Sequence, residues 1–132
     1  MKLTQAQLQQ IRLISDTDLY RDAERFLTER GVVERSQVQG LQDFARSFSE
    51  LEQFVKHQSE RDWQGRKEHY GSFYKALSQY LQELRQRVKI RYQLVPEDLA
   101  KKEAKEQVDF FVGLLAQEFL QHLTSELIYR NI

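Results

Sequence analysis

The chain has 132 residues, a length that fits one domain whose hydrophobic core can fold without disulfides or a structural metal. It contains no cysteine, which excludes disulfides, thiolate metal sites and cysteine nucleophiles. Twenty basic and twenty acidic side chains give zero net charge, which argues against a duplex-DNA-binding protein because such proteins are usually strongly basic. We therefore expect a single domain over residues 1–132.

The first two expected helices lie at the start of the chain. Thr4 is a suitable N-cap for a helix that continues to about Ile14. The polar residues 15–18 are expected to end this helix and to cap a second one. The second helix ends before Gly31, a residue type that easily adopts the left-handed conformation of a helix stop. The apolar positions of the two helices are Leu8, Ile11, Leu19, Ala23, Phe26 and Leu27.

Two shorter helices are expected in the next part of the chain. Ser36 is a suitable cap for the first of them. Ser49 and Glu52 have the spacing of a capping box, which predicts the start of the second. Gly65 marks a break after it. Their apolar positions are Val38, Leu41, Phe44, Ala45, Leu51, Phe54 and Val55.

The strongest periodic pattern begins at Tyr70, where apolar residues recur at intervals of three, four and seven positions. This pattern predicts a long helix from about Arg66 to Tyr92. Gly71 lies inside it and weakens it by roughly 1 kcal/mol relative to alanine.

Pro96 separates this helix from a last one. The residue before a proline avoids the α conformation, so the long helix must end by Leu94 or Val95. Pro96 suits the first turn of a final helix that runs to about Tyr129. We therefore predict an all-α, compact helical bundle of about five or six helices, two of them long and antiparallel.

The last helix has an unusually wide apolar face. Its apolar residues cover half of the circumference or more, whereas an ordinary surface helix shows a narrower stripe. Either this helix lies centrally among the others, or part of its face contacts another protein. The residues concerned are Phe110, Phe111, Val112, Leu114, Leu115, Phe119 and Leu123.

No metal site, cofactor or catalytic group is expected. The Glu-x-x-His motif of di-iron bundles is absent before His57, His69 and His122. There is no glycine-rich phosphate loop and no Gly-x-Ser-x-Gly elbow, and the serines at expected helix starts are explained as caps. Glu118 and His122 are four positions apart, a pair typical of a surface contact. We expect a protein that is not an enzyme.

No segment has the pattern expected of a signal peptide or of a membrane-spanning helix. The N-terminal residues are not followed by the apolar core of a signal peptide. The densest apolar stretch, residues 110–120, is interrupted by Gln117 and Glu118 and is too short to span a bilayer. We expect a cytoplasmic protein without a membrane partner.

Basic residues provide the remaining functional signal. Arg85 and Lys89 are four positions apart, as are Arg87 and Arg91, so on a helix they form two neighbouring rows. The planar fork of arginine holds phosphate oxygens two at a time. We hypothesise that these residues contact phosphate. The alternative is that they only form the solvated surface of a helix, which would carry similar charges.

A second basic group surrounds Trp63. Its cations can contact phosphates, whereas the rings that can stack on bases or on arginine stems are Tyr80 and Tyr92 beside the basic run. Phosphate contacts carry no sequence information, so binding is expected to be sequence-blind and steeply salt-dependent. The members of this group are Lys56, Arg61, Arg66 and Lys67.

The chain resembles the small helical subunits of type III CRISPR–Cas effector complexes. In that family an early helix is followed by a short turn and a helix start of the type Ser-Gln-Ile/Val-Arg. Ser36, Gln37 and Val38 match this start, whereas Gln39 stands where the family often has arginine and so offers no charge for a backbone contact. The segments that carry the resemblance are residues 23–27, 31–33 and 36–41.

The resemblance implies a non-catalytic subunit of a ribonucleoprotein for antiviral defence. Its partners would be guide RNA and target RNA, other effector-complex subunits and copies of itself, with basic residues supporting the RNA. The alternative is a helical protein–protein adaptor or dimerisation module without nucleic acid. RNA binding that depends on the basic run would favour the first, and a protein partner without nucleic acid the second.

Overall fold

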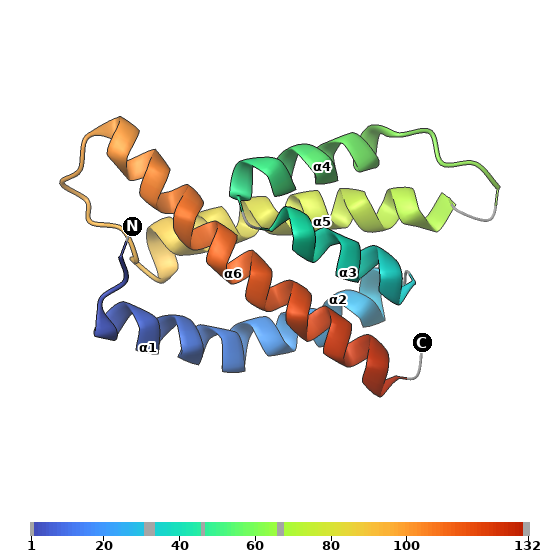
Figure 1. The fold of residues 1–132 in the computed structure, drawn as a ribbon, viewed down its shortest axis with the longest axis horizontal. Helices are drawn as coiled ribbons and strands as arrows, with labels where there is room; N and C mark the ends of the chain where they lie inside the picture. The colour runs from blue at the N-terminus through green and yellow to red at the C-terminus, as the bar shows by residue number, and fades with distance from the viewer. Residues whose placement is uncertain (1, 31–33, 46, 66–67, 131–132) are drawn as a thin grey trace.

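The computed structural model describes residues 2–30, 34–45, 47–65 and 68–130, and the predicted helix stop at Gly31 lies outside them. Within these ranges the chain is helical and contains no strand, so the predicted all-α class is confirmed. The elements are α1 (Gln5–Ile14), the π-helical turn η1 (Ser15–Leu19), α2 (Tyr20–Arg30), α3 (Arg35–Phe44), α4 (Phe48–Glu60), α5 (Glu68–Gln86), the π-helical turn η3 (Arg87–Arg91) and α6 (Lys101–Tyr129) (Figure 1).

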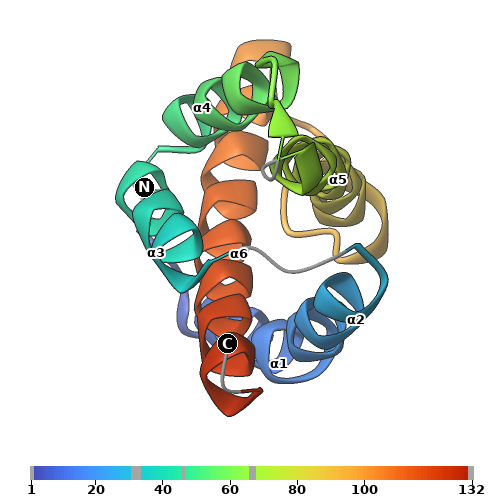
Figure 2. The same ribbon diagram turned by 90° about the vertical axis from the view of Figure 1, so that its right-hand side faces the viewer.

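The helix α6 is the centre of the bundle. It contacts α2, α3, α4, α5 and η1, and Figure 2 shows it running between the other helices. Most of its wide apolar face is therefore covered by the chain itself, as a central position requires, whereas Phe110 and Leu114 are half-buried and line a surface cavity. Although α6 has 29 residues, none of the described helices is both long and apolar enough to cross a membrane. Its buried side chains include Val108, Phe111, Val112, Leu115, Ala116, Phe119, Leu120, Leu123 and Leu127.

The two longest helices run in opposite directions, as predicted. The chain leaves α5, turns through residues 92–100 and returns as α6, which crosses α5 obliquely (Figure 1). The closest neighbour of α5 along its length is α4, which lies beside it. The buried face of α5 is the periodic one expected from the sequence: Tyr70, Phe73, Tyr74, Leu77, Tyr80, Leu81 and Leu84.

The N-terminal helix begins at the predicted cap but does not end where expected. The Thr4 hydroxyl accepts a hydrogen bond from the Gln7 backbone N–H (3.1 Å), and the Gln7 side chain accepts one from the Thr4 N–H (2.9 Å). The predicted break at residues 15–18 is wrong, because the chain continues through η1 into α2. The polar side chains find other partners: the Thr17 hydroxyl donates to the Leu13 carbonyl of the same helix (2.7 Å), and Ser15 contacts His122 of α6 (3.0 Å).

Two other predicted caps are each wrong by two positions. The N-cap of α3 is Glu34 rather than Ser36, and it has no side-chain capping bond. The N-cap of α4 is Ser47 rather than Ser49, and its hydroxyl accepts a hydrogen bond from the Glu50 N–H at 3.5 Å. Both serines that were expected to cap are exposed within a first helical turn.

The loop between the long helices is longer than expected. Pro96 was predicted in the first turn of the last helix, but α6 begins only at Lys101. The reason is that Gln93 adopts a positive φ of 48° and Leu94 folds back into the core, where its N–H donates to the Val88 carbonyl (3.2 Å). The chain then needs several more residues before the next helix can start.

Candidate nucleic-acid interface

The basic run lies at the C-terminal end of α5 and in η3, and its two rows point to different surroundings. Arg87 and Arg91 face acidic side chains of the N-terminal helices. Arg85 and Lys89 instead line a groove beside α6. The four cations therefore do not form one continuous surface.

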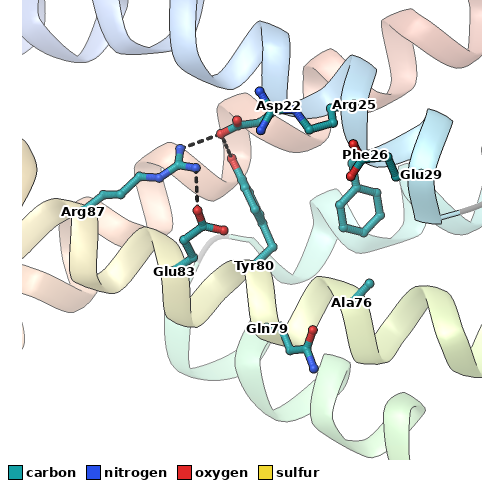
Figure 3. Close-up of a pocket in the computed structure, with 9 residues that line it drawn as sticks. All are labelled: Asp22, Arg25, Phe26, Glu29, Ala76, Gln79, Tyr80, Glu83 and Arg87. Atoms are coloured by element: carbon teal, nitrogen blue, oxygen red, sulfur yellow. Dashed lines mark hydrogen bonds and ion pairs between the residues drawn. The ribbon is translucent and has the colours of Figure 1, made fainter.

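Arg87 is held by two acidic side chains, one of which also accepts a hydrogen bond from Tyr80 (Figure 3). Its Nη1 donates to Asp22 Oδ2 (2.6 Å) and its Nη2 to Glu83 Oε1 (2.9 Å). The hydroxyl of Tyr80 donates to the same Asp22 oxygen at 2.7 Å. The Arg87 side chain is 14% exposed and that of Asp22 is 11% exposed, so this ion pair is largely shielded from water.

The protonation of this cluster is fixed by its surroundings. Burial and then the Asp22 charge raise the pKa of Tyr80 well above its ordinary value, which keeps the phenol neutral. Burial opposes the charge of Arg87, but the hydrogen bonds to Asp22 and Glu83 outweigh it and raise the guanidinium pKa. A phosphate that took Arg87 would leave a buried carboxylate without its cation, which is unfavourable.

The cavity beside this cluster is also unsuited to phosphate. It has a volume of about 190 Å³ and is lined by three acids and two arginines (Figure 3). Its acids would repel an anion. The acids are Asp22, Glu29 and Glu83, and the arginines are Arg25 and Arg87.

Arg91 shares a carboxylate with Tyr92. Its Nη2 lies 3.5 Å from Asp18 Oδ2, and the Tyr92 hydroxyl donates to that oxygen at 2.6 Å. Burial and the hydrogen bond to Asp18 raise the pKa of Tyr92 to about 12. Asp18 belongs to η1 and Arg91 to η3, so the two π-helical turns meet at this contact. The Arg91 side chain is 62% exposed, which makes this the weaker of the two anchor points.

The second row of the run contributes to a basic groove between the end of α5 and the start of α6. We use the name basic groove for the cavity of about 380 Å³ whose cations are Arg85, Lys89, Lys101 and Lys105. Val95, Pro96, Ala104 and Val108 line it with apolar atoms, and Glu97 is its one acid. Four cations against one acid give the basic groove a local excess of positive charge.

The lysines of the basic groove are available to a ligand, whereas its arginine is anchored. Arg85 forms an ion pair with Asp109 and lies over the Phe48 ring, with 4.8 Å from Cζ to the ring centroid. Lys89, Lys101 and Lys105 are exposed and take part in none of the ion pairs of the described residues. A polyanion would meet three unpaired ammonium groups here.

The N-terminal end of α6 adds to this positive potential. Lys101, the first residue of α6, lines the basic groove, and the N-cap residue Ala100 provides no side-chain hydrogen bond. The free backbone N–H groups of a first helical turn carry partial positive charge. The lysines and the helix end therefore act in the same direction.

Sequence reasoning missed Lys101 and Lys105. In the sequence they alternate with Glu97 and Asp109 at helical spacing, a pattern typical of a solvated face held by weak ion pairs. In the structure Asp109 pairs with Arg85 across the bundle, which leaves the two lysines together. Their spacing of four, on a helix that follows a reversal of the chain after a basic run, was the available signal.

The second predicted basic group lies at the opposite end of α5 from the basic groove (Figure 1). Lys56 is exposed at the surface of α4. The Arg61 guanidinium lies over the Trp63 ring, 4.5 Å from its centroid. Arg66 and Lys67 lie outside the described residues, so the structure does not place them.

No metal-binding cluster is found where the structure describes the chain, since no group of three His, Asp or Glu side chains is placed to hold an ion. His122 instead contacts Ser15 (3.0 Å from Nε2 to Oγ) and packs against the edge of Tyr20, with 5.8 Å between ring centroids. The Ser15 side chain is buried, and this contact joins η1 to α6.

Comparisons of the chain with models of protein families, with curated proteins and with solved structures found no match.

Proposed function

We propose that this protein is a non-catalytic helical subunit of a ribonucleoprotein and that it supports an RNA backbone in its basic groove. The observation that carries this proposal is the convergence of Lys89, Lys101 and Lys105, none with a carboxylate partner among the described residues, on one groove. The sequence resemblance to small subunits of type III CRISPR effector complexes supports placing it in such an assembly, beside guide and target RNA and copies of itself.

The chemistry of the groove suits a sugar–phosphate backbone. Ammonium groups are compact charges that contact phosphates without a fixed geometry. The apolar atoms of Val95 and Val108 offer a surface for the less polar sugar. Since no base edge need be read, the proposed binding is independent of sequence.

The zero net charge of the chain indicates how tightly it should bind RNA. Three lysines provide few phosphate contacts, so the isolated chain should bind RNA weakly and lose the complex as salt rises. Several copies on one strand would bind more tightly through avidity. This expectation fits a subunit that acts within a larger assembly.

The proposal is tested by fluorescence anisotropy with a labelled single-stranded RNA at low salt. The triple variant Lys89→Ala, Lys101→Ala and Lys105→Ala should bind at least tenfold more weakly, because each phosphate contact contributes to affinity. A matched triple variant replaces the exposed Lys2, Lys75 and Lys102 by alanine. These three lysines lie outside the groove, so the two triple variants have the same net charge but differ in where charge is lost. Equal losses in both variants would show a nonspecific charge effect and contradict the groove.

The alternative, a protein–protein adaptor without nucleic acid, is favoured by a different surface. Tyr20 and Tyr129 are 51% and 84% exposed and line one shallow groove with His122. Exposed tyrosines are common in protein interfaces. A native pull-down separates the two functions: the adaptor predicts a protein partner whose retention is unchanged by nuclease treatment.

A further inference from the structure

A cavity that belongs to neither the basic run nor the basic groove lies beside Trp63. It has a volume of about 330 Å³ and is formed by residues of α3, α4, the segment after α4 and α5. Three aromatic rings, three amides and one pair of opposite charges surround it. The lining residues are Gln37, Phe54, Gln58, Arg61, Asp62, Trp63, Gln64 and Tyr70.

The indole of Trp63 is fixed in place by its neighbours. Its Nε1–H donates to the Gln58 carbonyl at 2.7 Å. It stacks on Tyr74, with 6.0 Å between centroids and 12° between planes, and meets Tyr70 edge-on at 5.4 Å. A ring that is already ordered loses little further freedom when a ligand stacks on it.

Gly71 makes this arrangement possible. A Cβ atom at this position would lie 3.1 Å from Cδ1 of Trp63, closer than ordinary contact. The glycine inside α5, which weakens the helix, is therefore explained by the close approach of the indole.

Arg61 also lies over the indole ring. Its guanidinium lies 4.5 Å from the ring centroid, and the side chain is exposed. No carboxylate of the described residues forms an ion pair with it. Because stacking of a base on an aromatic ring is stronger than an exposed cation–π contact, a flat heteroaromatic ring can displace this guanidinium. The displaced cation would remain close enough to pair with a phosphate.

The amides around the cavity provide both donors and acceptors. The Gln37 oxygen accepts a hydrogen bond from the Tyr74 hydroxyl (2.9 Å), which turns its NH₂ group away as the free end. The Gln64 amide donates to Asp62 (3.0 Å) and keeps its oxygen free. No described residue forms a hydrogen bond with the side chain of Gln58. Donors and acceptors beside a stacking surface match the edge of a nucleobase, whereas a plain hydrocarbon ring would leave them unpaired.

We propose that the Trp63 cavity binds a single unpaired nucleobase, stacked on the indole with its edge against the glutamine amides. The base could be supplied by single-stranded RNA or by a free nucleotide, since both present the same ring and phosphate. The proposal stands on this cavity alone; only the RNA source rests on the function proposed above.

The protein has one tryptophan, so selectively excited tryptophan fluorescence reports on this cavity. The ligands are adenosine and uridine monophosphates, the hexaribonucleotides of adenine and of uracil, and a hexameric ribose–phosphate chain without bases. A stacked base should quench the emission. Quenching by monophosphates and hexamers identifies a site open to free nucleotides, and quenching by hexamers alone identifies a base presented by a strand. No quenching by any base-bearing ligand up to millimolar concentration, or equal quenching by the chain without bases, would overturn the proposal.

Two variants with a matched control locate the effect. Gly71→Ala should push the indole aside by a few tenths of an ångström and so weaken the base-dependent quenching. Gly40→Ala is the control, because it makes the same change within a helix where a new Cβ meets nothing within 4 Å. Gln58→Ala keeps the backbone carbonyl that holds Trp63 and removes only the amide, so it should weaken binding without changing the fold. Unchanged quenching in both test variants, with far-UV circular dichroism showing folded protein, would contradict the assignment.

The anisotropy and fluorescence titrations test the base site at Trp63 and the RNA site in the basic groove separately. The triple lysine variant of the basic groove should lose affinity for the hexamers in anisotropy but keep the base-dependent quenching of Trp63. Gly71→Ala should keep the salt-dependent affinity for the chain without bases. Failure of the first result contradicts the groove alone, and failure of the second contradicts the independence of the Trp63 cavity.

Discussion

Arg87 and Asp22 form a shielded ion pair at 2.6 Å that joins the end of α5 to α2, although 65 positions separate them in the chain. The Tyr80 hydroxyl donates to the same carboxylate oxygen, so Asp22 has two partners. An arginine that was a candidate for phosphate contact is therefore part of the framework of the fold. The basic run contributes to the proposed interface only through its other row.

Replacement of Arg87 should destabilise the protein. Arg87→Ala leaves the largely buried Asp22 without its cation, a change that typically lowers the free energy of unfolding by about 3 kcal/mol. Arg91→Ala is the matched control in the same π-helical turn, and its loss should be under about 1 kcal/mol because the side chain is 62% exposed. Urea denaturation measures both. Similar losses in the two variants would show that the Arg87 cluster is not a special anchor.

The stability should decline at high pH because of Tyr92. Burial and the bond to Asp18 raise its pKa to about 12, so the folded state holds the phenolic proton more strongly than the unfolded chain does. This contribution is complete below a pH of about 10, the ordinary tyrosine pKa, and is lost as the pH rises toward 12. Tyr92→Phe should flatten the fall in melting temperature between those values. An unchanged pH profile would contradict the raised pKa.

Core substitutions test the position of the two long helices. Leu81 is 1% exposed and Phe111 is fully buried, so Leu81→Ala or Phe111→Ala should cost roughly 2 to 5 kcal/mol. Ile90→Ala is a control in the same region, because its side chain is 69% exposed and should contribute little. Thermal melting compares the three variants. A melting temperature unchanged by Phe111→Ala would be incompatible with a central α6.

The start of α4 provides a test between two neighbouring serines. Ser47→Ala removes the hydroxyl that accepts from the Glu50 N–H and should cost about 1 kcal/mol, the usual value of an N-cap. Ser49→Ala removes an exposed hydroxyl within the helix and should be close to neutral. Denaturant unfolding distinguishes them. The opposite order would restore the cap position expected from sequence spacing.

The long helices were predictable because their pattern is long and regular. The face of α5 from Tyr70 to Leu84 repeats often enough to specify a helix without tertiary information. The wide apolar face of α6 left two interpretations, and the choice required knowledge of what packs around it. Short polar segments were less predictable: Ser15 has the chemistry of a cap, but its partner His122 is 107 positions away and allows the helix to continue.

The candidate site was predictable only in part, for an electrostatic reason. The sequence shows which residues are basic but not which acids neutralise them. Asp22 and Asp109 lie far from Arg87 and Arg85 in the chain and pair with them only after folding. Lys101 and Lys105 lie in the groove without a carboxylate partner in the described part of the chain because Asp109 pairs with Arg85 instead. Spacing along the helix does not predict that pairing. The cationic neighbours of Trp63 were visible in the sequence, but the cavity beside its ring was not.

The salt dependence of RNA binding tests the central claim most directly. For single strands the slope of log K against log salt is about −0.7 per phosphate contact, so removing Lys101 and Lys105 should make the slope less steep by roughly 1.4. Lys2→Ala with Lys102→Ala removes the same charge outside the basic groove and should leave the slope of the unmodified protein. We predict that difference between the two double variants. Identical slopes in both, or no measurable RNA binding at low salt, would contradict the basic groove as an RNA-backbone site.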